Sequence, residues 1–277
     1  MAEILQDATK DALLLFPFIF IIYMLMEIWE EARNKEKIEK ALSGSCAPVV
    51  AAFTGIIPEC GFSVMCAKLY DTGFITTGTL IAAFVSTNDE GLIVLLSGGA
   101  GAYPVLLLLA FKIIFAVFLG LLLNVIMPLN KTRRSNRGCC LECGQRHGGF
   151  FDTFVMHPFY HSAKTFVYIF AVNIFFGVIL YFIGEDALNR FISGSSALQP
   201  VIAPIIGLIP NCASSILLAS AYLKGAIGFQ GLLAGLVANA GLGLAVVAKN
   251  SENRKKTLFI ILILYLAGVF SGYCAMI

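Results

Sequence analysis

The sequence has little charge. Of its 277 residues only 13% are Asp, Glu, Lys or Arg, whereas 58% are hydrophobic and the mean hydropathy is +0.86. A soluble domain carries about 25% charged residues, which help to cover its surface in water. This chain has too little polar surface to cover a globule, and its composition therefore predicts an all-α polytopic membrane protein.

Motifs that would indicate other classes of protein are absent. No G-x-x-x-x-G-K-[ST] stretch occurs, so direct use of ATP is not expected unless a partner protein supplies it. The first apolar run is followed by charged residues rather than by a small-residue cleavage site, which predicts a retained span instead of a signal peptide. The eight cysteines lack the even spacing of a secreted disulfide scaffold, so we expect thiols.

One stretch of the chain occurs twice. The sequence GIIPECGFS at 55–63 returns 152 positions later as GLIPNCASS at 207–215, and sixteen of the forty-four positions from 48 to 91 are identical in the second copy. The apolar runs follow the same offset: 11–29, 48–70, 74–97 and 102–127 recur as 163–183, 198–223, 226–248 and 257–276. We therefore predict a first transmembrane repeat over 1–127, a linker over 128–161 and a second repeat over 162–277.

Pro58 and Pro210 interrupt corresponding apolar segments of the two copies. Proline removes a backbone donor and clashes with the preceding helical turn, so each segment is predicted to form two half-helices. Short loops rich in Lys and Arg face the cytoplasm. The three basic loops, 30–40, 128–146 and 249–256, can all do so if each broken segment enters the membrane and turns back as a hairpin.

This topology gives each repeat three full spans and one re-entrant hairpin, about ten helical segments in all, with the N- and C-termini outside and the repeats inverted. If residues 48–70 crossed straight through with a kink, the basic linker would instead lie outside. Inverted repeats with broken segments at matching positions are typical of secondary transporters that bind substrate near the middle of the membrane. Unwound backbone is tolerated there only where it lines protein or a watery cavity.

Three carboxylates are predicted at membrane depth, all of them in the first copy. Glu59 aligns with Asn211, whereas Asp89 and Glu90 have no acidic counterpart. Each costs at least about 2.5–3.5 kcal/mol unless it is paired, protonated or solvated, so functional roles are expected. Lys112 is the only basic residue well inside an apolar run, and no intramembrane Lys or Arg is an obvious partner for the acids. This pattern favours the binding of a cation.

The predicted substrate site combines these acids with nearby amides, hydroxyls and thiols: Glu59, Cys60, Ser63, Asn88, Asp89, Glu90, Asn211, Cys212, Ser215 and Asn239. Carboxylate, amide and hydroxyl oxygens suit a hard or intermediate divalent ion such as Mn²⁺, and thiols add softer character. Adjacent acids repel one another when both are charged, so entry of the metal is predicted to release a proton.

Other interpretations of the same residues stay open. Asp89 and Glu90 would also suit the start of a half-helix near an interface, where acids interact favourably with the helix dipole. Small thiols in a membrane core, such as Cys60 and Cys66, often serve only packing. The half-helices that begin after the two prolines attract anions rather than cations, so an anionic or neutral substrate is an alternative.

The linker holds a second group of metal-ligand side chains. Three cysteines and all three histidines of the chain fall within residues 139–161. Cys140-x-x-Cys143 followed by His147 has ligand types at a plausible spacing, which predicts a cytoplasmic patch for metal acquisition or sensing. A basic interfacial loop with reduced thiols is the alternative.

These motifs resemble those of a family of ten-helix heavy-metal exporters, which are also described as manganese transporters and are distantly related to arsenical permeases. The resemblance rests on GIIPECGFSV at 55–64, AAFVSTNDE at 82–90, IGLIPNCASS at 206–215 and the Cys/His-rich linker. It covers nearly the entire chain and implies metal efflux across the cytoplasmic membrane. The linker departs from the family pattern, because it is rich in Cys rather than in His.

We therefore expect a multi-pass protein of a bacterial cytoplasmic (inner) membrane that exports a divalent metal ion, with Mn²⁺ as the first candidate, by alternating access in exchange for protons. The expected partners are the ion, the lipid bilayer and a second copy of the chain; neither a cofactor nor nucleic acid is expected. Competing hypotheses are a permease for arsenical or other thiol-reactive species, an organic-anion carrier and an intramembrane thiol oxidoreductase. The last would use Cys60 and Cys66, which lack the C-x-x-C spacing, so an enzyme is not expected.

Overall fold

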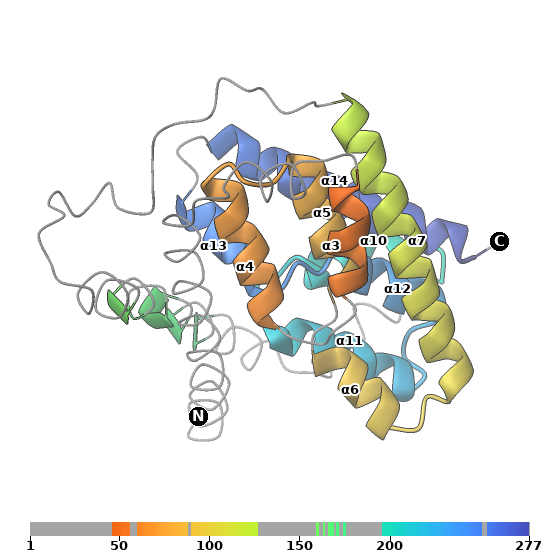
Figure 1. Ribbon diagram of the computed structural model, residues 1–277. Helices are drawn as coiled ribbons and strands as arrows, with labels where there is room; N and C mark the ends of the chain where they lie inside the picture. Colours follow the sequence, from red (N-terminus) through yellow and green to blue (C-terminus); the bar gives the residue numbers. More distant parts are fainter. Residues whose placement is uncertain are drawn as a thin grey trace, which may run out of the picture.

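The computed structural model describes residues 46–55, 60–87, 90–126, 196–250 and 254–276, with ten further residues scattered between 159 and 175. The helices of the five continuous ranges are α3 (Ala47–Thr54), α4 (Cys60–Asp71), α5 (Thr77–Ser86), α6 (Glu90–Ser97), α7 (Ala102–Ile126), α10 (Gln199–Gly207), α11 (Cys212–Leu223), α12 (Phe229–Ala238), α13 (Leu242–Asn250) and α14 (Arg254–Cys274) (Figure 1). The described residues contain no strand, in agreement with the all-α prediction. The predicted first span, most of the run 163–183 and the linker lie outside them.

The helix boundaries recur with the sequence repeat. Helices α4 and α11, and likewise α5 and α12, begin and end 152 positions apart, while α6 and α7 begin 152 positions before α13 and α14. The turn between α4 and α5 also recurs between α11 and α12. Gly73 and Gly225 there have φ angles of 81° and 70°, a left-handed conformation that glycine adopts without strain.

The proline-containing segments are broken, as the sequence predicts. Helix α3 ends at Thr54 and α4 begins at Cys60. In the second copy α10 ends at Gly207 and α11 begins at Cys212, with Pro210 in the non-helical stretch between them. Proline at that position cannot supply the backbone donor that a continuous helix needs. Each segment therefore forms two half-helices.

Each copy contains a second break, this time without proline. Helix α5 ends at Ser86 and α6 begins at Glu90, where the polar stretch 86–90 predicts an interruption. The matching run 226–248 contains only Gln230 and Asn239 as strongly polar residues, yet α12 and α13 are separated by residues 239–241. Gly241 has a φ of 54° in this gap, which turns the backbone out of the helix.

Four helical segments among the described residues are long and apolar enough to cross a membrane. They are Thr77–Ser97, Ala102–Ile126, Phe229–Lys249 and Arg254–Cys274, of which the first and third contain the second breaks. The two broken segments are 80% and 94% buried, whereas the two continuous helices are only 28% and 39% buried. Large apolar side chains such as Ile114 and Val125 point outward from α7. These proportions fit broken segments at the centre and continuous helices at a lipid-facing periphery.

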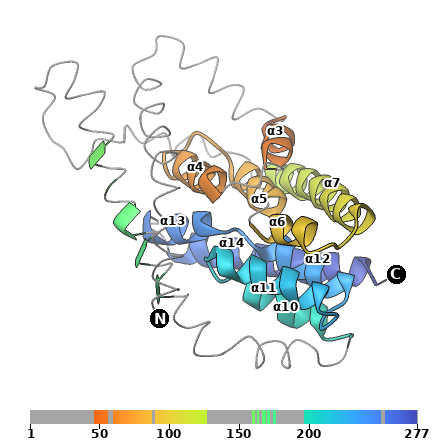
Figure 2. The ribbon, with the colours of Figure 1, turned by 90° about the horizontal axis from the view of Figure 1, so that it is seen from below.

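The helices pack in two ways, within one copy and between the two copies. Within the first copy α3, α5 and α7 contact one another, and within the second copy α10, α12 and α14 do the same. The remaining helices cross over, because α4 packs against α13 and α11 packs against α6 (Figures 1 and 2). Exchanging the two copies converts each of these contacts into the other, which is the property of a two-fold interface.

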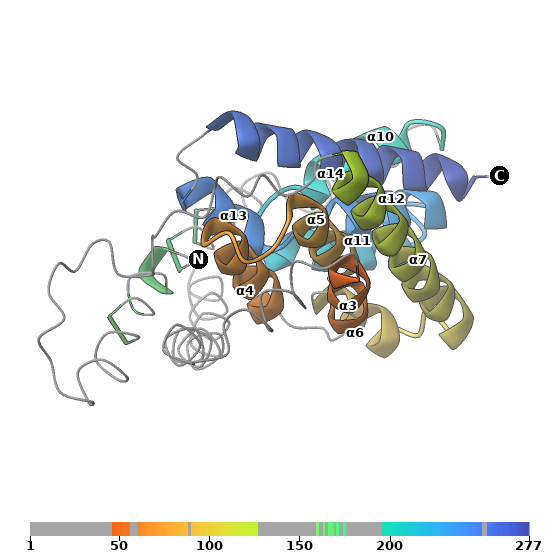
Figure 3. The ribbon, with the colours of Figure 1, turned by 45° about the horizontal axis from the view of Figure 1, so that its top comes forward.

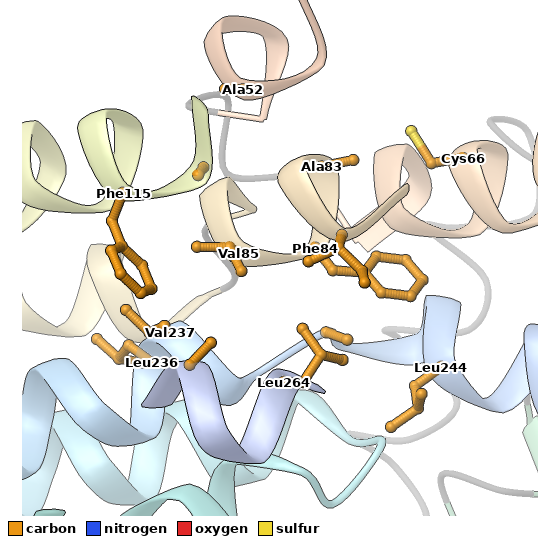
Figure 4. Packing of buried hydrophobic residues seen from close by; sticks show 14 of the residues in the cluster. Ala52, Cys66, Ala83, Phe84, Val85, Phe115, Leu236, Val237, Leu244 and Leu264 are labelled. Atoms are coloured by element: carbon orange, nitrogen blue, oxygen red, sulfur yellow. The ribbon is translucent and has the colours of Figure 1, made fainter. Parts of the chain in front are cut away.

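The core lies where α5 meets α12 between the two sets of helices (Figure 3). Phe84 and Val85 from α5 face Leu236 and Val237 from α12, and Leu264 of α14 lies beside them (Figure 4). All five side chains are at most 5% exposed. Because α5 and α12 stop inside this apolar region, their ends are surrounded by protein.

Two glycines allow the crossed helices to approach closely. A Cβ atom on Gly243 of α13 would lie 2.5 Å from the backbone oxygen of Ser63 in α4. A Cβ atom on Gly91 of α6 would lie 2.7 Å from the backbone oxygen of Ser215 in α11. The two contacts correspond under the 152-residue offset, so the same close approach is built twice.

Adding a methyl group at either glycine should therefore destabilise the protein. We expect Gly91→Ala and Gly243→Ala each to cost about 1–3 kcal/mol, because a backbone oxygen cannot move aside as a side chain can. The measurement is the midpoint of thermal unfolding in detergent. The control is Ala110→Val, which adds volume at an exposed position of α7 and should leave the midpoint unchanged. A midpoint that stays at the wild-type value in both glycine variants would contradict the close packing.

Candidate functional site

The polar residues predicted for the site lie at helix ends inside the core. Ser63 belongs to the first turn of α4, and its Oγ accepts a hydrogen bond of 3.2 Å from the backbone amide of Gly243, in the first turn of α13. Ser215 of α11 lies in the matching position against Gly91 of α6. Each hairpin therefore places the start of its second half-helix against the helix break of the other copy.

The two junctions are close to one another. A Cβ atom on Gly243 would lie 2.7 Å from the ring of Phe84, which is near the C-terminal end of α5. Figure 4 shows the same ring extending from α5 toward α13. The end of the first copy's broken segment thus reaches the break of the second copy, and together they form one candidate region.

Helix termini of both polarities contribute to this region. Helices α4, α6, α11 and α13 begin there, and α5 and α12 end there. The first amides of a helix carry partial positive charge and the last carbonyls carry partial negative charge, and both lack intrahelical partners. The region can therefore bind ions of either sign, according to which ends face the ligand.

The two predicted amides each cap such an end. Asn211 is the N-cap of α11, and its Oδ1 accepts a 3.0 Å hydrogen bond from the amide of Ala213. Asn239 follows α12, and its Oδ1 accepts a 2.9 Å hydrogen bond from the amide of Gly241. Both side chains are buried. An amide oxygen has two lone pairs, so a capping bond is compatible with a second interaction.

Buried hydroxyl groups surround the amides. Ser63 and Ser215, both predicted, are fully buried. Ser214 was not among the predicted site residues, although it is also fully buried and donates a 2.7 Å hydrogen bond to the Asn211 carbonyl. At the end of α5, Thr87 donates a 2.6 Å hydrogen bond from its hydroxyl to the carbonyl of Ala83. These hydroxyls satisfy backbone groups that the broken helices expose.

Lys112 is the residue of this region that the sequence does not assign. It lies on the buried face of α7, is 1% exposed, and donates a 2.7 Å hydrogen bond from Nζ to the backbone carbonyl of Thr87. This carbonyl belongs to the C-cap of α5. One sequence feature could have identified it. Lys112 falls at helical spacing within a stripe of otherwise apolar residues that face the core: Val105, Leu108, Phe115 and Leu123. Lys112 therefore reaches the backbone two positions before Asp89 in the sequence, and whether it pairs with the acids stays a prediction.

Several predicted ligands cannot be placed in this geometry. Pro58, Glu59, Asn88 and Asp89, and the linker residues Cys140, Cys143 and His147, lie outside the described residues. Cys60, Glu90 and Cys212 are described only as the first residues of α4, α6 and α11. Within the described residues no three His, Cys, Asp or Glu side chains form a group that could hold a metal ion. The roles of the acids and of the linker patch therefore stay predictions.

The thiol hypothesis gains little from the one cysteine of the hairpins whose side chain is described. Cys66 is 4% exposed and packs within the hydrophobic core, one turn of α4 beyond Ser63. It belongs to the cluster of buried hydrophobic residues (Figure 4). This position favours packing as its role.

The capping bond of Asn211 can be tested separately from any transport. We expect Asn211→Ala to lower the midpoint of thermal unfolding, because loss of an N-cap acceptor costs about 1 kcal/mol. Asn211→Ser keeps an uncharged oxygen acceptor at the same position and should unfold close to the wild-type midpoint. Equal destabilisation by the two substitutions would show that the cap is not the stabilising interaction.

Comparison with known proteins finds a family model that matches the second part of the chain. Residues 151–277 match the family model described as "Putative, 10TM heavy-metal exporter". This is the family that the sequence motifs resemble, so the resemblance is confirmed over the second part of the chain. No curated protein and no solved structure matches the chain.

Proposed function

We propose that this protein is a secondary transporter that exports a metal ion through the region where the helix breaks of the two copies meet. The observation that carries the proposal is the pair of matching contacts, Ser63 with Gly243 and Ser215 with Gly91. They place unwound backbone and buried polar groups inside apolar, membrane-length segments, where substrate sites of secondary transporters are found. The match of residues 151–277 to a heavy-metal exporter family supports export of a metal.

Alternating access fits the way in which the copies contact each other. In the proposed topology the two repeats are inverted, and the hairpins enter from opposite sides of the membrane. Swapping the two copies turns the contact between α4 and α13 into the contact between α11 and α6, and this symmetry supports the inverted relation of the repeats. If the repeats adopt two unequal arrangements, exchanging their conformations opens the site to the opposite side.

Manganese is the proposed cargo, and protons are the proposed exchange partner. The described part of the region offers hydroxyl, amide and carbonyl oxygens, which suit a hard or intermediate divalent cation. In the sequence Asp89 directly precedes α6 and Glu59 directly precedes α4, so we expect carboxylates at the starts of these two helices. Carboxylates there would attract the metal and hold protons in its absence.

An organic-anion carrier is the second candidate. The ammonium of Lys112 and the N-termini of four helices all supply positive charge to the region. Such groups are the usual partners of a carboxylate or phosphate at membrane depth. The metal proposal ranks first because the family match names an exporter of heavy metals.

The cargo can be tested in proteoliposomes with Mn²⁺, Zn²⁺, arsenite and methylarsenite. We expect Mn²⁺ flux in the wild type, a loss of about tenfold or more in Asp89→Asn because a charged ligand is removed, and little change in Cys60→Ser. Flux of an arsenical that depends on Cys60 but not on Asp89 would support the thiol-based alternative. Unchanged Mn²⁺ flux in Asp89→Asn would remove the carboxylate from the site.

The inverted topology can be tested with a single cysteine at position 136, introduced as Asn136→Cys after replacement of the native cysteines. Because the basic linker is expected in the cytoplasm, a membrane-impermeant thiol reagent should label this position only after the cells are opened. A cysteine in the segment between α6 and α7, for example Ala100→Cys, serves as the matched position on the outside. Labelling of position 136 in intact cells would overturn the inverted arrangement.

A further inference from the structure

Lys112 carries a charge at a place where burial is costly. Its side chain is 1% exposed in a helix that is long and apolar enough to span a membrane. A lysine at the centre of a membrane helix costs about 2.5–3.5 kcal/mol or more, so such residues are retained where they have a specific partner. Here the partner includes the Thr87 carbonyl, 2.7 Å from Nζ.

The carbonyl that Lys112 reaches lies at the negative end of a half-helix. Thr87 is the C-cap of α5, and its own backbone amide and hydroxyl both donate to the carbonyl of Ala83. Ser86 also donates its hydroxyl to the carbonyl of Ala83. The end of α5 is thus held in place by side chains, with the Thr87 carbonyl directed at a cation. In broken transporter helices, carbonyls at half-helix C-terminal ends coordinate a coupling ion such as Na⁺.

The second copy shows that packing alone does not require a lysine. The position that corresponds to Lys112 is Leu264 of α14, which is fully buried in the same core. Thr87 corresponds to Asn239, which ends α12 in the same way that Thr87 ends α5. Two equivalent helix ends therefore have different neighbours, an ammonium group in the first copy and an aliphatic side chain in the second.

We propose that the Lys112 ammonium is a built-in substitute for a coupling metal cation at the C-terminal end of α5. The ammonium supplies one positive charge and hydrogen-bond donors to a carbonyl that would otherwise favour a monovalent ion such as Na⁺. The transport cycle consequently needs no Na⁺, K⁺ or Li⁺. The consequence for the transport cycle rests on the proposed transport function. The position of the ammonium at the end of α5 does not depend on the identity of the cargo.

The wild-type protein provides the first test. Metal flux into proteoliposomes should stay within about twofold when Na⁺ and K⁺ are both replaced by a large organic cation such as N-methyl-D-glucamine, which is too bulky to replace Na⁺ at a buried backbone carbonyl. A wild-type protein whose flux requires Na⁺, K⁺ or Li⁺ would overturn the proposal. A wild-type protein that moves no metal under any ionic condition would instead contradict the proposed function.

Lys112→Ala tests the position directly. We expect flux to fall about tenfold or more, because a buried hydrogen bond from a charged group is lost. Added n-propylammonium should restore it severalfold, since this ion replaces the atoms removed from the lysine. The matched variant is Lys112→Leu, which carries the second copy's residue, fills the space and should be equally impaired without rescue. Lys255→Ala, at an exposed position of α14, should behave as the wild type.

Thermal unfolding of the purified variants in detergent separates this proposal from transport. Propylammonium or Na⁺ should raise the unfolding midpoint of Lys112→Ala and leave those of the wild type and Lys112→Leu unchanged, because only the alanine variant has a vacant cation position. Wild-type flux in Lys112→Leu would show that the ammonium is dispensable and would refute the proposal. A Lys112→Ala protein that folds but responds to neither ion would refute it as well.

Discussion

Backbone amides and carbonyls that a broken helix exposes need partners when no water is present, and this requirement shapes the centre of the molecule. Every unsatisfied group in hydrocarbon costs several kcal/mol, so helices normally cross a membrane without interruption. Here the helices are interrupted near Thr87 and at 239–241, and the hairpin of the second copy is interrupted around Pro210. Side chains of the same segment or of another helix accept or donate at these points, which explains why polar residues are concentrated in an otherwise apolar core.

The hydrogen-bond partners follow the symmetry of the two copies, whereas the charged residues do not. Ser63 accepts from the amide of Gly243, and Ser215 lies in the corresponding contact with Gly91. The ends of α5 and α12 differ, because Lys112 donates to Thr87 whereas Leu264 occupies the equivalent position beside α12. The three predicted carboxylates are also confined to the first copy. Positive and negative charge has therefore been added to the same half of a duplicated framework.

This arrangement has a consequence for how an ion would be bound. A duplicated framework by itself supplies hydroxyl, amide and carbonyl oxygens on both sides of the junction, together with helix ends of both polarities. A fixed ammonium in one half lowers the attraction of that half for a free cation, whereas carboxylates raise it. The balance between Lys112 and the acids would then decide the charge of the cargo, which links the proposed transport function to the proposed role of Lys112.

The sequence by itself determined the membrane class, the offset of the repeat, the breaks near the prolines and the uninterrupted run that forms α7, because hydropathy, proline and glycine act on the backbone locally. It also identified Ser63, Asn211, Ser215 and Asn239 as buried polar residues of interest. Only the tertiary structure decided that α4 packs mainly against α13 of the other copy, and that Lys112 donates to the carbonyl of Thr87. Both depend on which faces of distant helices meet, and that follows from the packing of side chains that are far apart along the chain.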